Sequence, residues 1–156
     1  MSLFHTFEGF EALGVSQAIR GSVWLFPAIE ALHLLALATL GGTILMVDLR
    51  LMGAGLNTQP TVAVERDARP WFLGALAVML ATGVPLALSE AVKLYDKPSF
   101  WVKMAALALA LAFALAVRVW LVKRVEAGSP AAWATAMLSL TLWLTVAVAG
   151  RWIGFS

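Results

Sequence analysis

Residues 26–52 form an apolar stretch long enough to cross a lipid bilayer, yet they include two residues able to do chemistry, Glu30 and His33. Ionisable side chains inside a membrane-spanning segment are costly and usually serve a function. The only other histidine of the chain is His5, close to the N-terminus. His33 is therefore the one imidazole that metal or proton chemistry within a membrane could use.

The helix predicted around these residues carries a polar stripe on one face. With about 3.6 residues per turn, the residues that share the face of His33 are Phe26, Glu30, Leu37, Leu40, Gly41, Ile44 and Asp48. Lipid offers no partner to an imidazole or a carboxylate, so the stripe should face the interior of the protein. Gly41 and Gly42 remove side chains beyond His33, which permits either close helix packing or the approach of a flat ligand. The same two interpretations apply to the pair Thr82 and Gly83.

The composition is that of an integral membrane protein. Of the 156 residues, 62% are hydrophobic and 13% are charged, and the mean hydropathy is +0.88. The formal net charge is only +2, which gives no reason to expect a nucleic-acid partner. The chain has no cysteine, which excludes disulfides, thiolate-bound zinc and iron–sulfur clusters. A chain of this length is expected to form a single transmembrane domain.

Four apolar blocks predict four membrane-spanning helices. They cover residues 22–47, 70–92, 100–121 and 131–153, and charged or Pro/Gly-containing segments separate them. Six of the seven tryptophans lie near block ends, as expected of aromatic belts at both membrane surfaces, and Trp143 is the exception. The predicted fold is therefore an all-α integral membrane four-helix bundle with both termini on one side.

The residues before the first block predict an interfacial amphipathic helix over about 3–19. Phe4, Phe7, Phe10 and Leu13 recur at helical spacing, and polar residues fill the positions between them. His5 would lie on this helix near the lipid headgroups, where it would be solvated.

The spacing of Glu30 and His33 also matches the Glu-x-x-His motif of di-iron helical bundles. Such bundles need two copies of the motif and two further carboxylates. The chain has one copy, and no histidine follows His33. Neither a di-iron centre nor a structural zinc site is therefore expected within one chain. Glu30 has a second interpretation, as a solvated residue near the membrane surface.

A common use of a single histidine in a membrane helix bundle is to bind haem iron, because the bundle offers an apolar slot for the macrocycle. We predict that His33 binds haem b, with Arg50 or Lys103 available for the haem propionates. The residues expected around the cofactor are Glu30, Gly41, Gly42, Arg50 and Lys103. Lys103 and Arg118 have an alternative role, in which they extend along the helix to reach the membrane surface.

The segment ALHLLALATLGGTILMVDLRLMG, residues 31–53, resembles a bacterial family of small four-span proteins of unknown function. More distantly it is similar to the HemJ-type protoporphyrinogen oxidases and the CopD-type membrane proteins. The HemJ-type resemblance implies a haem b ligand at His33, an exit motif at residues 49–51, and a third helix that opens with Trp101 and an important Lys103. Asp48 stands where that family has a proline. Because of this difference, the resemblance does not by itself imply oxidase activity. The resemblance also implies a multi-pass protein of the bacterial inner membrane.

The sequence leaves the second axial ligand of the haem open. The candidates are His5, Met79, Met104, Met137, the same histidine of a second copy, or no ligand at all.

Two other functions compete with haem binding. In an accessory or structural subunit without a cofactor, His33 would bond to Glu30 or to a hydroxyl group of another helix. The hydroxyl groups considered are those of Thr135, Ser139, Thr141 and Thr145. A copper or small-solute permease would use methionines as soft ligands, but they form no MxxM or HxxM cluster. Under each function we expect a lipid environment and a homo-oligomer or a larger membrane complex.

Overall fold

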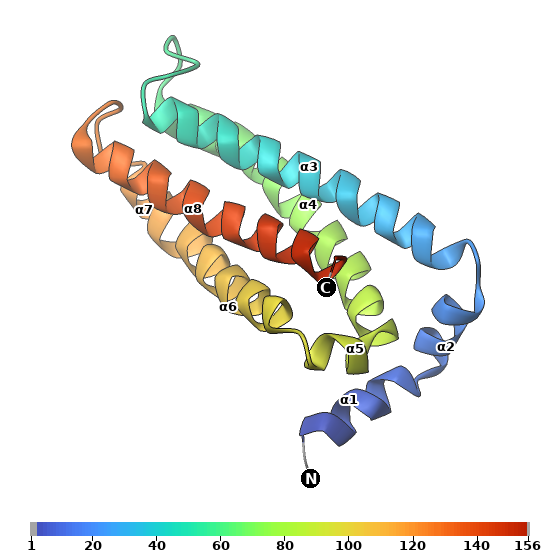
Figure 1. The fold of residues 1–156 in the computed structure, drawn as a ribbon. Helices are drawn as coiled ribbons and strands as arrows, with labels where there is room; N and C mark the ends of the chain where they lie inside the picture. Colours follow the sequence, from blue (N-terminus) through green and yellow to red (C-terminus); the bar gives the residue numbers. More distant parts are fainter. Residues whose placement is uncertain (1–2, 156) are drawn as a thin grey trace.

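Four long helices make up most of the computed structural model, which describes residues 3–155 (Figure 1). They are α3 (Leu25–Leu51), α4 (Thr61–Ser89), a third span (Pro98–Leu121) and α8 (Pro130–Ile153). The third span consists of α6 (Pro98–Ala112), the π-helix η1 (Phe113–Arg118) and α7 (Val119–Leu121). The described residues include no strand, and all four spans are apolar enough to cross a bilayer, so the predicted all-α membrane bundle is confirmed.

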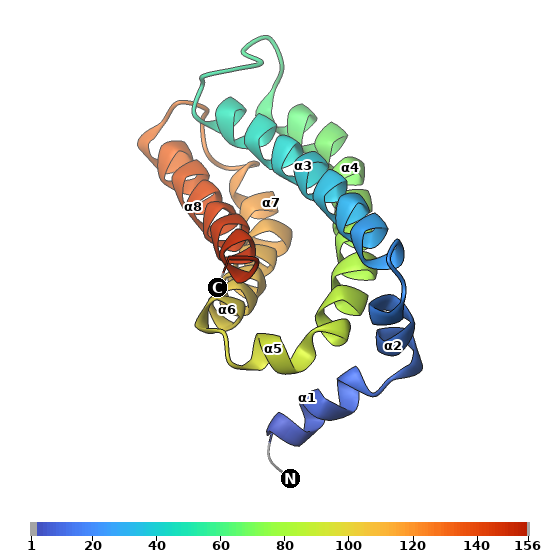
Figure 2. The same cartoon turned by 45° about the vertical axis from the view of Figure 1, so that its right-hand side comes forward.

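The four spans pack as two pairs. α3 packs along α4, α6 packs along α8, and contacts between α3 and α8 join the pairs. The pairs converge at the end that carries loops 52–60 and 122–129, and they separate towards the end where the short helix α5 (Ala91–Tyr95) links them (Figure 2). At the converging end the backbone N–H of Gly128 donates to the carbonyl of Leu51 at 2.8 Å, which ties the two pairs together.

Two apolar clusters form the core between the middle of the bundle and its converging end. Cluster 1 contains Leu40, Ile44, Phe72, Ala75, Ala106, Ala110, Ala114, Trp143 and Val146. Cluster 2, closer to the loops, contains Val47, Leu51, Val64, Ala68, Val122, Ala132 and Ala136. Many of these residues are alanines, because small side chains let membrane helices approach closely.

The second span begins earlier than the sequence predicts. Residues 61–69, expected in a loop over 48–69, form the first turns of α4, so only loop 52–60 remains. The reason is their periodic inward face: Thr61, Val64 and Ala68 are buried, whereas the charged residues between them are mostly exposed. A hydropathy average over this segment is low because of its charged residues, and it does not detect the helical spacing of the buried ones.

The N-terminal segment forms two short helices rather than the single helix expected over 3–19. α1 (Leu3–Glu11) and α2 (Gly14–Gly21) lie across the α5 end of the bundle (Figure 1). The ring of Phe7 contacts the rings of Tyr95 and Trp101, at centroid distances of 5.2 and 6.1 Å. Glu11 accepts a hydrogen bond from the backbone N–H of Val92 at 2.9 Å. The segment is therefore packed against the bundle and not only amphipathic.

Five of the seven tryptophans lie near the ends of the spans as predicted, whereas Trp71 lies ten residues inside α4 because that helix begins at Thr61. Six are exposed, by between 45% and 81%, namely Trp24, Trp71, Trp101, Trp120, Trp133 and Trp152. Trp143 is the exception, because it lies in cluster 1 with its ring edge-on to Phe72.

Candidate functional site around His33

The imidazole of His33 connects the two helices of the first pair. Its Nδ1 lies 2.8 Å from the hydroxyl oxygen of Thr82 on α4. That hydroxyl donates its own hydrogen to the carbonyl of Val78 at 2.7 Å, so towards the imidazole it acts as an acceptor. The hydrogen-bond network therefore assigns the ring proton to Nδ1 and leaves the lone pair of Nε2 available to a metal or a proton.

Gly83 lets the imidazole lie directly on α4. A Cβ atom at this position would stand 2.9 Å from Cε1 and 3.5 Å from Nδ1 of His33. Any larger residue at position 83 would clash with the imidazole ring. The ring could move away only by losing its hydrogen bond to Thr82. Of the two roles expected for Gly83, close packing is the one that the structure shows, and the group packed there is the imidazole itself.

Lys103 occupies the facing position on the second pair. Its half-buried side chain runs over Gly150 of α8, where a Cβ would stand 3.4 Å from both Cε and Nζ. The ammonium group is close enough to His33 for their charges to interact. The separated half of the bundle thus places an imidazole on one pair and a cation on the other.

Three residues expected beside His33 do not join this arrangement. Glu30 is exposed, in agreement with its second interpretation. Gly41 and Gly42 are exposed as well, and a Cβ at either would meet no other group within 4 Å. Their prediction as an interior notch is wrong, because eight residues of helix rotate Gly41 about 80° away from the direction of His33. The inward positions of this part of α3 are taken by Leu40 and Ile44 instead.

Arg50 lies at the opposite end of α3 from His33. Its Nε donates to the carbonyl of Gln59 at 2.6 Å, a contact that holds loop 52–60. Arg50 follows His33 by 17 positions, which correspond to about 25 Å along the helix axis. Arg50 and Lys103 therefore do not form one cationic site around His33.

The candidates for a second axial ligand differ in their exposure and in their contacts. His5 is exposed on α1, and its Nδ1 pairs with Glu8 at 2.9 Å. Met104 and Met137 are 43% and 51% exposed. Met79 is half-buried, its backbone carbonyl bonds the imidazole, and its side chain packs against cluster 1.

Within residues 3–155, no three His, Asp or Glu side chains gather closely enough to hold a metal ion.

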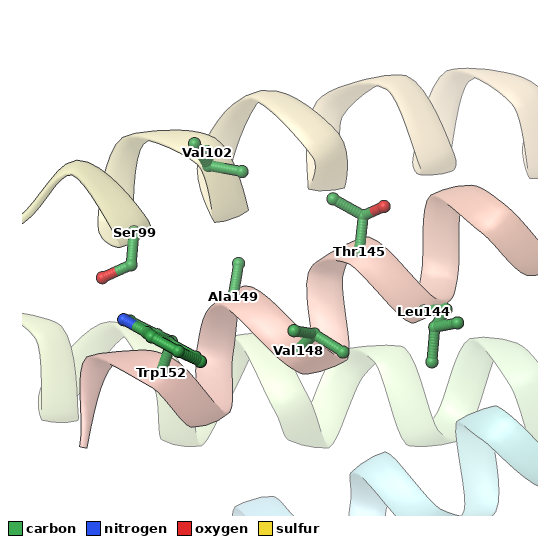
Figure 3. A pocket seen from close by; sticks show the side chains of 7 residues that line it. All are labelled: Ser99, Val102, Leu144, Thr145, Val148, Ala149 and Trp152. Atoms are coloured by element: carbon green, nitrogen blue, oxygen red, sulfur yellow. The ribbon is translucent and has the colours of Figure 1, made fainter. Parts of the chain in front are cut away.

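Two apolar grooves on the outer surface are separate from His33 and Lys103. A groove of about 400 Å³ between α6 and α8 has Ser99 and Trp152 at one end and Leu144 at the other (Figure 3). A groove of about 350 Å³ lies between α3 and α4, next to Trp71. Their apolar lining on lipid-facing helices suits acyl chains and offers no group for redox or metal chemistry.

A second group of polar residues lies in the converging half of the bundle, and the sequence does not predict that its members meet. Arg118, for which an extension to the membrane surface was one expectation, is 3% exposed and contacts Asp48 and Glu65. Hydropathy predicts that Glu65 lies in a loop, whereas in the structure it is buried in α4. The available signal was the position of Asp48 on the inward stripe of the first span, which the structure confirms.

The four spans and their interior polar groups define a small multi-pass membrane protein. The profile of the family of unknown function DUF6644 matches residues 8–156, and the chain belongs to this family. The match confirms the resemblance to a four-span family of unknown function that residues 31–53 indicate. Comparison with curated proteins and with solved structures gives no match.

Proposed function

We propose that the protein binds haem b through Nε2 of His33 and takes part in a redox or electron-transfer reaction of the membrane. The observation that carries the proposal is the bond from Nδ1 of His33 to Thr82, which is itself bonded to the carbonyl of Val78. Histidines that bind metals commonly donate their second ring N–H to an oxygen of the protein, and this bond fixes the ring and its tautomer. His33 meets that requirement with Nε2 left over.

The residues around His33 suit a haem better than a bare metal ion. A porphyrin supplies the equatorial ligands of its iron, so a five-coordinate iron needs only one ligand from the protein, here the imidazole. Apolar helices surround the position, and Lys103 provides a cation for a propionate on the facing pair. His33 and Lys103 are also among the residues that the resemblance to HemJ-type proteins implies.

Each residue then has a distinct task. His33 would hold the iron, Thr82 and Gly83 would keep the imidazole in one orientation, and Lys103 would neutralise a carboxylate. Haem, when bound, supplies one-electron redox chemistry, whose potential depends on the axial ligands and on burial.

A second candidate function, an accessory subunit without cofactor, is favoured by the same hydrogen bond. An interhelical bond between His33 and Thr82 stabilises the α3–α4 pair whether or not a ligand is present. The hydroxyl partner lies on α4 and not on the fourth span, where the sequence offered four candidates. No comparable observation favours a copper or solute permease.

The visible spectrum of the purified protein tests the proposal. Protein produced with an adequate haem supply should show a Soret band, and a pyridine haemochrome assay should identify haem b. His33→Ala should abolish both signals, while His5→Ala, which changes the only other histidine, should retain them. A colourless wild-type protein, or unchanged haem content in His33→Ala, would contradict haem binding at this residue.

The role of Lys103 has its own test. Lys103→Met keeps the length of the side chain and removes its charge, so it should lower haem occupancy while the Soret band of the remaining haem keeps its position. Lys93→Met is the matched control, because Lys93 is exposed and pairs with Glu90 at the bundle end. If the protein is an accessory subunit, all variants are colourless and His33→Ala instead lowers its thermal stability or its retention in a larger complex.

A further inference from the structure

A buried group of charged residues occupies the converging half of the bundle, away from His33. Arg118 of η1 reaches two carboxylates: its Nη1 lies 3.6 Å from Oδ1 of Asp48 on α3, and its Nη2 lies 3.3 Å from Oε2 of Glu65 on α4. Asp48 is fully buried, and Arg118 and Glu65 are 3% and 9% exposed. Asp48 follows His33 by 15 positions, or about 22 Å of helix, so this group is distinct from the proposed haem site.

Apolar side chains close this group off on both sides. On α3, Asp48 lies between Ile44 of cluster 1 and Leu51 of cluster 2. On the third span Arg118 lies between Ala114 and Val122, which belong to the same two clusters. The charges therefore form a polar layer inside the bundle, in which Asp48 and Arg118 have almost no contact with bulk water.

The π-helix η1 is what directs Arg118 into this layer. In a regular α-helix each four-residue step rotates the side chain by about 40°, so a residue following Ala106, Ala110 and Ala114 would drift off the inward line. The wider π turn over Phe113–Arg118 compensates that drift. All three alanines and Arg118 are buried as a result.

The charges of the layer do not balance. Two carboxylates, Asp48 and Glu65, face one guanidinium, and α8 contributes to this layer the neutral residue Ser139. Arg69, one turn beyond Glu65 on α4, interacts with Glu65 from its exposed side and does not enter the layer. If both acids were ionised, the buried group would carry one net negative charge, which a protein interior tolerates poorly.

Several polar atoms of the layer lack a hydrogen-bond partner. They are both carboxylate oxygens of Asp48, Nε and Nη1 of Arg118, Oε2 of Glu65 and Oγ of Ser139. Ser139 is fully buried beside Asp48. A protonated carboxyl group would add one O–H donor to this layer, in which carboxylate oxygens lie beside a buried hydroxyl.

We propose that the polar layer is a proton-binding site, in which Asp48 holds one exchangeable proton and Glu65 remains ionised against Arg118. The assignment to Asp48 follows from geometry, since Glu65 has the shorter contact with Arg118 and the additional cation Arg69. In the binding step a carboxylate oxygen of Asp48 forms one O–H bond with a proton from hydronium and releases one water molecule. The step needs no oxidant or reductant and makes the layer electrically neutral.

Infrared difference spectroscopy of the purified protein between acidic and alkaline buffer tests the proposal. The wild type should show the carbonyl band of one protonated carboxylic acid that exchanges slowly in D₂O. Asp48→Asn should remove the band, and Glu65→Gln should remove it too, because the remaining acid then pairs with Arg118 as an anion. Asp67→Asn is the matched control and should retain the band, since Asp67 is exposed two positions after Glu65.

Isotope labelling secures the assignment if a variant fails to fold. Carboxyl-¹³C aspartate should shift the band in the Asp67→Asn, Asp96→Asn double variant, in which Asp48 is the only aspartate left. Three results would overturn the proposal: no protonated-carboxyl band in the wild type, a band that survives Asp48→Asn or Glu65→Gln, and a band that sodium ions remove at constant pH. The last result would make the layer a sodium site.

Discussion

Gly83 and His33 fit together because the glycine has no side chain: a Cβ on residue 83 would stand 2.9 Å from Cε1 of the imidazole. The preceding residue, Thr82, bonds Nδ1 of the same ring. The ring therefore cannot turn away from position 83 without losing its hydrogen bond. Two consecutive residues of α4 thus fix both the place and the orientation of one side chain on α3.

Gly83→Ala should displace the imidazole and weaken the α3–α4 contact. Overpacking at a tight interface costs about 1–3 kcal/mol, which exceeds the roughly 1 kcal/mol that alanine gains over glycine in a helix. We therefore expect a lower midpoint of unfolding in detergent and, under the proposed function, a lower haem content. Thermal unfolding followed by circular dichroism and the Soret absorbance measure the two effects.

Gly74→Ala provides the control, because Gly74 lies on the same helix and a Cβ there would meet no other group within 4 Å. This variant should be as stable as the wild type or more so. Equal effects of the two substitutions would show that helix propensity, and not contact with His33, decides the outcome.

Thr82→Val should separate the hydrogen bond of His33 from its packing. Valine has the shape of threonine without the hydroxyl, so Nδ1 of His33 loses its acceptor while the contact with Gly83 stays. Loss of such an oxygen partner lowers the metal affinity of a histidine by about 10–100-fold in metalloproteins. Under the proposed function, haem titration of the apoprotein measures this change.

The matched variant is Thr39→Val. The hydroxyl of Thr39 bonds only the carbonyl of Leu35 in its own helix, at 3.0 Å. Its removal should leave haem affinity unchanged. A Thr82→Val protein with wild-type affinity would mean that Thr82 has a purely structural role.

The four spans and the inward face of the first one could be predicted from the sequence, because both follow from strong periodic signals. Apolar blocks long enough to cross a bilayer are rarely anything else. The stripe through His33, Leu37, Ile44 and Asp48 holds because helical spacing determines which residues share a face. The prediction that Gly41 lies beside His33 is wrong, because the small rotation between successive turns of a helix adds up over two turns.

The polar layer could not be predicted, since its members come from separate parts of the sequence. Glu65 lies in a charged segment that reads as a loop by average hydropathy, and only packing against α3 makes it interior. Arg118 needs the π turn of η1 to point inward, and no sequence pattern of alanines and valines specifies that turn. The positions of Glu65 and Arg118 both depend on how a helix is rotated against its neighbours, and this rotation is a property of the packed bundle.

Arg118→Met should be among the most destabilising single changes in the bundle. It leaves Asp48 and Glu65 buried without their cation, and the loss of one partner from a buried ion pair costs about 3–5 kcal/mol. The deficit should shrink in acidic buffer, where protonated carboxylic acids need no cation. Unfolding of wild type and variant at several pH values measures both effects.

Arg66→Met is the comparison for a surface charge. Arg66 pairs with Asp67 at 3.1 Å, and both side chains are exposed. Its loss should change stability by no more than about 1 kcal/mol. A similar effect of the two arginine substitutions would contradict the buried role of Arg118.

Glu11→Ala should loosen the N-terminal segment from the bundle. One carboxylate oxygen of Glu11 accepts the backbone N–H of Val92 at 2.9 Å, and the other pairs with Arg20 at 2.7 Å. Glu11 thus links α1, α2 and α5, and its removal leaves the N–H of Val92 without this partner. Amide hydrogen exchange should become faster at Val92 and throughout residues 3–21, while the cores of α3 and α8 stay protected. Glu8→Ala, which removes only an exposed contact with His5, should leave all these rates unchanged.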